Sequence, residues 1–396
     1  MLPKGSRSHE QKLAEAVNLF EALDVDVAYA EHVNLAKISP ATLLGGGVVE
    51  RLAEAVKAEK LEVVMVDAIL SPRQQRELEV ALGAKVIDRT GVILDIFARR
   101  ARTKAGKLQV EAAMLAYQQS RLVRLWSHLE RQRGGMGKTG GPGERQLELD
   151  KRILRARMAK VRGELLNVER ERGLQRMARQ RAQVPTVALV GYTNAGKSTL
   201  FNRLVDAGTL VADALFATLD PLMRKLELPG GLEIVMVDTV GFIADLPHEL
   251  VEAFKATLEE VVMADVLLHV HDASNPEMLA QAADVRGVLA QLGAGDKRVI
   301  EVYNKVDKAG DWLVPKGGMG VSALTGEGTQ ELLVAIAKVL QEDWQQLKVQ
   351  VPASDGRRLA WLYAHGTVLS KQLDGEMWTL QVKLREGDVQ LWERLK

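Results

Sequence analysis

The segment from Thr186 to Leu204 constrains the fold of this chain more than any other. It reads TVALVGYTNAGKSTLFNRL, with an apolar run before Gly191 and a helical pattern after Ser198. The Gly-x4-Gly-Lys-Ser spacing lets the backbone curl, so that successive N–H groups converge beside a helix N-terminus. Such a turn binds phosphates where a strand enters a helix. The segment therefore predicts an α/β domain with a mostly parallel sheet and a phosphate site at its carboxyl edge.

A second apolar run, LEIVMVD, ends in Asp238, about forty residues beyond that turn. At a strand end the Asp238 carboxylate can hold Mg²⁺ through a water, and the Ser198 hydroxyl can ligate the same ion. Lys197 would neutralise the β- and γ-phosphate oxygens, and the Gly241 N–H can meet the γ-phosphate. These residues predict Mg²⁺-assisted, in-line attack of water on a nucleoside triphosphate.

The tetrapeptide Asn304-Lys305-Val306-Asp307, at the end of another apolar run, predicts that the base is guanine. The Asp307 carboxylate can accept hydrogen bonds from N1–H and the exocyclic amine of guanine, a donor pair that adenine lacks. A site whose buried polar groups stay unpaired rejects the wrong ligand strongly. The later segment Ser322–Leu324 can supply a backbone N–H to the guanine O6. The chain is therefore expected to bind GTP and GDP and to hydrolyse GTP.

Residues 97–181 carry a large excess of positive charge. They hold 22 Lys/Arg against 8 Asp/Glu, although the formal net charge of the whole chain is only +1. A chain that segregates charge in this way usually presents a basic surface to a polyanion such as RNA. A helical arm that is merely solvated is the alternative interpretation.

The same region has two apolar seams at helical spacing. They consist of Leu115, Leu122, Leu125 and Leu129, and of Leu154, Met158, Val161, Leu165 and Val168. The second series steps by four and three, as in a heptad repeat. Residues 133–145 lie between the seams and contain six glycines and a proline, a composition that excludes helix. We expect a long antiparallel helical hairpin, the arm, with a Gly-rich loop at its tip.

The remaining segments predict two smaller α/β units. Short β-branched runs at 60–68 and 84–89 flank a helix that Ser71-Pro72 starts. The last stretch reads as a helix followed by a turn at Asp374-Gly375 and a strand. The predicted organisation is an N-terminal α/β subdomain at 1–95, the basic hairpin at 96–183, a P-loop GTPase domain at 184–346 and a small α+β domain at 347–396.

Composition excludes several classes of protein. The chain contains no cysteine, which rules out a disulfide scaffold and a thiolate metal site. The charged start lacks the apolar stretch of a signal peptide, and no apolar run reaches the roughly 18 residues that cross a bilayer. A cytoplasmic protein with no membrane span is expected.

The chain resembles the translational GTPases of the HflX family from end to end. The resemblance rests on four segments: Asp88–Phe97 (DRTGVILDIF), Gly106–Glu111 (GKLQVE), Gly141–Glu148 (GPGERQLE) and Phe216–Asp220 (FATLD). It implies that Thr218 ligates Mg²⁺ when γ-phosphate is present. It also implies binding to the large ribosomal subunit and its rRNA, splitting of stalled ribosomes, and a tip loop that reaches toward the peptidyl-transferase centre. A monomer is expected.

The predicted site combines the motifs and the resemblance. Catalytic roles are assigned to Lys197, Thr218 and Gly241, and Mg²⁺ is assigned to Ser198, Thr218 and Asp238. The residues expected to contact the nucleotide are Gly191, Tyr192, Thr193, Asn194, Ala195, Gly196, Lys197, Ser198, Thr199, Phe216, Ala217, Thr218, Leu219, Asp220, Asp238, Thr239, Val240, Gly241, Asn304, Lys305, Val306, Asp307, Ser322, Ala323 and Leu324.

Two segments depart from the family pattern, and one position departs from the pattern of many small GTPases. Arg145 stands where family members commonly have threonine. Gly45–Gly47 lacks the lysine that many members carry after such glycines, so we interpret it as a turn rather than a second nucleotide site. Phe242 occupies the position where many small GTPases have a glutamine that orients the attacking water. Because a phenyl ring cannot hydrogen-bond water, slow hydrolysis by the isolated chain is expected.

Two functions fit these observations. The favoured one is a GTPase that acts on the ribosome through its basic arm. The alternative is a GTP-gated RNA-binding or ribosome-assembly module in which turnover is secondary. Stimulation of hydrolysis by large subunits favours the first, and equal binding to any structured RNA favours the second.

Overall fold

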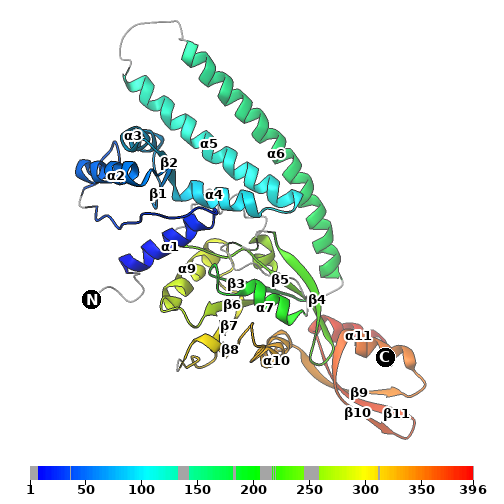
Figure 1. Cartoon of the computed structure of the whole chain (residues 1–396). Coiled ribbons are helices and arrows are strands. Elements are labelled where there is room, and N and C mark those ends of the chain that lie inside the picture. Colours follow the sequence, from blue (N-terminus) through cyan, green and yellow to red (C-terminus); the bar gives the residue numbers. More distant parts are fainter. Residues whose placement is uncertain are drawn as a thin grey trace.

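The computed structural model describes residues 8–35, 37–132, 142–181, 184–205, 216, 218, 220–244, 258–310 and 313–395. Figure 1 shows an N-terminal α/β unit, a long pair of helices that projects from it, a central sheet domain and a small C-terminal unit. This arrangement, with a mostly parallel central sheet, confirms the predicted fold class. The domain limits at 95, 183 and 346 remain predictions. Within the described ranges, no helix combines the length and apolar character that a membrane crossing requires.

The N-terminal unit is built on two short parallel strands. Its elements are α1 (His9–Glu21), α2 (Gly46–Glu59), β1 (Val63–Val66), α3 (Pro72–Leu82), β2 (Lys85–Asp88) and α4 (Arg89–Arg100). Val63 of β1 pairs with Lys85 of β2. The Ser71 side chain accepts the Gln74 N–H and Pro72 is the first residue of α3, as the sequence predicted.

Gly45–Gly47 is a helix start rather than the predicted turn. Gly45 caps α2 in an extended conformation, and Gly46 and Gly47 form the first turn of the helix. The N–H groups of a first turn have no partner within the helix, so glycine costs little there. The helical spacing of the apolar residues that follow therefore determines that Gly46 and Gly47 are helical.

The arm consists of α5 (Lys104–Gln132) and α6 (Pro142–Arg181), which run antiparallel to each other in Figure 1. Buried Met158 and Val161 of α6 pack against Leu108 and Leu115 of α5. The predicted α6 seam is therefore confirmed, whereas the α5 seam begins nearer the base of the arm than the sequence suggested. The described part of the structure does not include the side chains of Leu122, Leu125 and Leu129.

The prediction that all of 133–145 is non-helical is wrong for its last four residues. Helix α6 begins at Pro142, so Pro142–Arg145 form its first turn. Proline is favourable at that position because its fixed φ suits a helix and its missing N–H has no partner there anyway. Residues 133–141, which include most of the predicted tip loop, lie outside the described ranges.

The central domain is a six-stranded sheet in the order β4-β5-β3-β6-β7-β8. Its strands are β4 (Leu222–Leu228), β5 (Leu232–Asp238), β3 (Thr186–Gly191), β6 (Val266–Asp272), β7 (Arg298–Asn304) and β8 (Met319–Gly320), and all but β4 run parallel to their neighbours. Helices α7 (Lys197–Leu204), α9 (Met278–Gln291) and α10 (Thr329–Leu340) pack on the sheet. Every residue of β3 is buried, so the strand that leads to the phosphate turn is rigidly held.

The C-terminal unit is a three-stranded antiparallel sheet with two helices. Its elements are β9 (Gln345–Pro352), α11 (Gly356–His365), β10 (Gly366–Asp374), β11 (Met377–Leu384) and α12 (Glu386–Leu395). The predicted turn lies between β10 and β11, where Gly375 has φ of +59°. Strand β9, which pairs with β11, was not predicted.

Asp88 joins the N-terminal unit to the arm. Its carboxylate is 1% exposed and accepts hydrogen bonds from the Gly91 N–H (2.9 Å), the Tyr117 hydroxyl (2.5 Å) and the Arg121 guanidinium (2.6 Å). Tyr117 and Arg121 belong to α5. The carboxylate thus caps α4 and holds the base of the arm against it.

We expect Asp88→Ala to lower the free energy of unfolding by about 3–5 kcal/mol, because it leaves a partly buried guanidinium without its partner. Urea denaturation measures the change. The matched control is Asp343→Ala, since the carboxylate of Asp343 is 72% exposed and pairs with Arg298 at the surface. Surface ion pairs contribute little, so similar losses in the two variants would contradict the structural role of Asp88.

Candidate nucleotide site

The turn between β3 and α7 needs glycine at both ends. At Gly191, φ is +154° and a Cβ would lie 2.3 Å from the carbonyl oxygen of Val270 on β6. At Gly196, φ is +87° and a Cβ would lie 2.2 Å from Asn304 Nδ2. The two glycines therefore let β3 approach β6 and let the turn approach the end of β7.

Lys197 lies at the start of α7 with its ammonium in the turn. Its Nζ donates to the carbonyl oxygen of Tyr192 (2.8 Å), and the residue is 6% exposed. Burial lowers the pKa of Lys197 to about 8, and the charge of Asp238 partly opposes that shift. Phosphate oxygens near the ammonium would favour its charged form.

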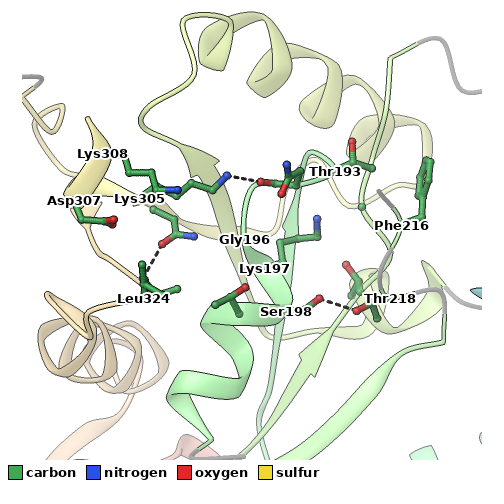
Figure 2. Close-up of a pocket in the computed structure, with 16 residues that line it drawn as sticks. Thr193, Gly196, Lys197, Ser198, Phe216, Thr218, Lys305, Asp307, Lys308 and Leu324 are labelled. Carbon is green, nitrogen blue, oxygen red and sulfur yellow. Dashed lines mark hydrogen bonds between the residues drawn. The ribbon is translucent and has the colours of Figure 1, made fainter. Parts of the chain in front are cut away.

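Three oxygens form a compact cluster beside the turn. Ser198 Oγ lies 2.7 Å from Thr218 Oγ1 and donates to Asp238 Oδ2 (2.6 Å), and Thr218 Oγ1 donates to the same carboxylate oxygen (2.8 Å). Figure 2 shows Ser198 and Thr218 pointing toward each other. The structure thus brings together the three residues that the sequence assigned to Mg²⁺.

This cluster suits a hard divalent cation. Asp238 is fully buried, and burial raises the pKa of its carboxyl group against the effect of the hydrogen bonds from Ser198 and Thr218. Within the described part of the chain, Asp238 Oδ1 is buried and has no hydrogen-bond partner. A buried carboxylate oxygen without a donor is costly, and a cation or one of its water ligands would satisfy it. The all-oxygen donor set is the one that Mg²⁺ prefers.

The opposite side of the site is tied together by the Asn304–Asp307 segment. Asn304 Nδ2 donates to the Ala195 carbonyl oxygen (2.9 Å), and Asn304 Oδ1 accepts the Ala323 N–H (3.0 Å). Lys305 Nζ donates to the carbonyl oxygen of Asn194 (2.8 Å) and to Asp272 (2.7 Å). These bonds join the phosphate turn to the segment at 322–324, with Asp307 beside them at the cavity wall.

A cavity of about 250 Å³ joins the two sides. Figure 2 shows Lys305, Asp307 and Lys308 at the end away from Ser198 and Thr218. The residues that line it are Thr193, Asn194, Gly196, Lys197, Ser198, Thr199, Phe216, Thr218, Thr239, Gly241, Asn304, Lys305, Asp307, Lys308, Ala323 and Leu324. All but Lys308 were in the predicted site.

Several predicted site residues do not line the cavity. They are Gly191, Tyr192, Ala195, Asp220, Asp238, Val240, Val306 and Ser322. Gly191 and Ala195 belong to the phosphate turn, and Asp238 accepts hydrogen bonds from Ser198 and Thr218, which do line the cavity. Ala217 and Leu219 lie outside the described residues. The Asp220 carboxylate instead accepts hydrogen bonds from the N–H groups of Arg102 and Thr103, directly before α5.

Phe242 packs in the core, 2% exposed. Its backbone pairs with the phosphate turn, because its N–H donates to Gly191 (3.1 Å) and its carbonyl oxygen accepts the Thr193 N–H (2.7 Å). The ring is not among the groups that line the cavity. Position 242 therefore offers the site no side chain that could orient water.

Sequence reasoning missed a buried polar network next to Phe242. Arg89 is 6% exposed and donates to the Ala244 carbonyl oxygen (2.9 Å), to Glu15 (2.7 Å) and to Asp67 (2.6 Å). The Tyr192 hydroxyl accepts the Ala244 N–H (2.8 Å) and donates to Glu15 (2.7 Å). The network joins the N-terminal unit to the Gly241–Ala244 segment. Its members are far apart in sequence, so no local pattern reveals it.

Arg203 is a second residue that the sequence did not reveal. It lies on α7, and its guanidinium donates to the carbonyl oxygens of Ala323 (3.1 Å) and Leu324. It holds the segment that borders the far end of the cavity. A lone arginine on a helix carries no signal of such a contact.

Comparison with known families covers almost the whole chain. Four family descriptions match in order: GTP-binding GTPase N-terminal at residues 10–98, GTP-binding GTPase Middle Region at 100–179, 50S ribosome-binding GTPase at 186–305 and HflX C-terminal domain at 314–395. A GTPase HflX from Magnetococcus marinus is 50% identical over 96% of this chain and 90% of its own length. The chain belongs to the HflX family of GTPases.

Other HflX proteins agree with this assignment. GTPase HflX of Escherichia coli K12 is 45% identical over 90% of this chain and 85% of its own length. Among solved structures, a GTP-binding protein from Sulfolobus solfataricus in complex with GDP is 21% identical, with a TM-score of 0.45, over 83% of this chain and 95% of that chain. The HflX resemblance predicted from the motifs is confirmed, and the chain is a P-loop GTPase.

Proposed function

We propose that this HflX-family protein is a Mg²⁺-dependent GTPase that binds the large ribosomal subunit and its rRNA through the arm and splits or rescues stalled ribosomes. The observation that carries the proposal is the union of a GTP site with a strongly basic two-helix arm. The match of residues 186–305 to a family described as 50S ribosome-binding GTPase supports the partner.

The geometry supports a separate role for each group of residues at the site. Ser198, Thr218 and Asp238 would hold Mg²⁺, which would supply positive charge next to the β- and γ-phosphates. Lys197 would bind the same phosphates and stabilise the charge that develops in the transition state. In-line attack requires a fixed orientation of the γ-phosphate, which the Gly241 N–H would provide. Asp307 would fix the base at the other end of the site.

The attacking water has no assigned orienting group. Phe242 is buried and apolar, so the isolated protein is expected to hydrolyse GTP slowly. A partner that orders the water, or that rearranges the site, would then raise the rate. Stimulation of that slow basal rate by large subunits distinguishes the ribosome-dependent enzyme from an RNA-binding module in which turnover is secondary.

The test is GTP turnover with and without purified ribosomal subunits. We expect large subunits to raise turnover at least about tenfold, which is modest beside the ~10³–10⁵ that a partner can supply. Small subunits and an equal mass of unrelated structured RNA should have little effect. Equal binding to any structured RNA, without stimulation of turnover, would support the RNA-binding module instead.

Reversing the charge of the arm tests whether the arm mediates the stimulation by ribosomal subunits while the nucleotide site alone supports basal turnover. Arg152, Arg155 and Lys160 are exposed on α6, and replacing all three by Glu should remove the stimulation while basal turnover remains. The matched control reverses three exposed lysines elsewhere, Lys57, Lys316 and Lys338. If the control loses stimulation to the same extent, general charge rather than the arm mediates binding.

A further inference from the structure

Thr218 lies between two contacts to the N-terminal half of the chain. Two residues before it, the Phe216 ring packs edge-on against Phe97, with 4.7 Å between the ring centroids, and both rings are 2% exposed. Two residues after it, the Asp220 carboxylate accepts hydrogen bonds from Thr103. Phe97 lies near the end of α4 and Thr103 directly precedes α5. We call residues 97–106 the α4–α5 corner.

The corner is shaped around the Asp220 carboxylate. Asp220 Oδ2 accepts the N–H groups of Arg102 (3.1 Å) and Thr103 (2.9 Å), and Oδ1 accepts the Thr103 hydroxyl. The Thr103 hydroxyl oxygen also accepts the Gly106 N–H (3.0 Å). A Cβ at Gly106 would lie 2.3 Å from Asp220 Oδ1, so only glycine lets the carboxylate sit there. A carboxylate at the start of α5 also suits the dipole of that helix.

The same short segment reaches the metal cluster. Thr218 Oγ1 lies 2.7 Å from Ser198 Oγ and donates to Asp238. Two residues span at most about 7 Å, so the contacts of Phe216 and Asp220 limit how far Thr218 can move. The α4–α5 corner thereby restricts where the Thr218 hydroxyl can lie relative to Ser198 and Asp238.

We propose that the α4–α5 corner positions Thr218 for GTP hydrolysis, with Asp220 as the positioning residue, and so couples the base of the arm to the phosphate site. The coupling is reciprocal, because a nucleotide that fixes Thr218 must also stabilise the bonds between Asp220 and the start of α5. The proposal does not depend on which partner binds the arm.

Three variants disrupt the contact between the Asp220 carboxylate and the α4–α5 corner. They are Asp220→Ala, Thr103→Val and Gly106→Ala. Each should lower kcat for GTP about 10- to 100-fold, the cost of a misplacement of about 1 Å. Each should also remove most of the gain that Mg²⁺ gives to the binding of a fluorescent non-hydrolysable GTP analogue. Binding of fluorescent GDP without Mg²⁺ should stay within about twofold of the parent, because Lys197, Asn304 and Asp307 are untouched.

Two control variants test whether the effect is specific. Thr103→Ser keeps the hydroxyl and should restore turnover to within about threefold of the parent. Gly163→Ala adds a Cβ to a helix glycine of α6 that has open space around it, and it should behave as the parent. Parental turnover and Mg²⁺ response in Asp220→Ala and Thr103→Val would overturn the proposal. Parallel losses of GDP affinity and unfolding midpoint in all three variants would also overturn it, since they indicate a merely structural contact.

Hydrogen exchange tests the reverse direction without turnover. The N–H groups of Arg102 and Thr103 donate to Asp220, so the GTP analogue with Mg²⁺ should slow their exchange at least about threefold relative to GDP. The effect should disappear in Asp220→Ala. Equal exchange at residues 102–106 with the two nucleotides in the parent protein would overturn the coupling between the corner and the phosphate site.

Discussion

Lys197→Ala is expected to lower GTP turnover by at least about 100-fold while the far-UV circular dichroism spectrum stays unchanged. The ammonium lies inside the phosphate turn, 6% exposed, and its protein hydrogen bond is to the Tyr192 carbonyl oxygen of the same turn. Its removal therefore takes a cation from the phosphates without breaking a contact between elements. Steady-state phosphate release measures the effect.

The control for this variant is Lys338→Ala. Lys338 is exposed on α10, and its replacement removes the same charge without touching the cavity. Turnover should then match that of the parent. Parental turnover in Lys197→Ala itself would show that another group stabilises the transition state, and the assignment of this turn would be wrong.

Asp307→Asn should weaken GTP binding by at least about 100-fold and improve the binding of xanthosine nucleotides. The carboxylate only accepts hydrogen bonds, whereas the amide presents a donor that suits the extra carbonyl oxygen of xanthine. Mismatched polar groups in a nucleotide site are rejected strongly. Asp307 borders the cavity at the end away from Lys197, so the phosphate contacts should remain.

Competition between fluorescent GDP and unlabelled guanosine or xanthosine diphosphate measures this change of specificity. Asp296→Asn makes the same chemical change at an exposed position outside the cavity and should leave specificity unchanged. If Asp307→Asn binds GDP as tightly as the parent does, the base lies elsewhere.

The parts of the site that the sequence predicted are those whose geometry is local. Gly191, Gly196 and Lys197 belong to one turn, and their spacing alone fixes how the backbone curls. Asp238 and Asn304 each end a strand, and the ends of parallel strands meet at one sheet edge. Chain connectivity therefore brings these residues to one edge of the sheet, where Gly196, Lys197 and Asn304 line the cavity and Asp238 accepts hydrogen bonds from Ser198 and Thr218 beside it.

Contacts between distant segments could not be predicted in this way. Asp220 follows Thr218 closely and was assigned to the nucleotide, but its carboxylate binds Thr103, more than one hundred residues earlier. Arg89 meets Ala244 across a still longer separation. No periodicity or motif encodes such pairs, because they depend on how complete units pack.

The predicted helix starts were wrong where two local preferences compete. Glycines favour loops, but Gly143, Gly46 and Gly47 lie in the first turns of helices, and Gly45 is the N-cap of α2. First turns tolerate residues that helix interiors do not, since their N–H groups need no partner within the helix. Composition alone therefore placed these helix starts too late.

The length of α6 gives the arm a mechanical property. Its 40 residues, at about 1.5 Å each, make a rod of about 60 Å. If the base of such a rod turns by about 5°, its far end moves by about 5 Å, which exceeds a hydrogen-bond length. A rotation at Asp220 and Thr103, from which α5 extends, would be amplified at the distant end of the arm, because the 29 residues of α5 at about 1.5 Å each put that end about 43 Å away.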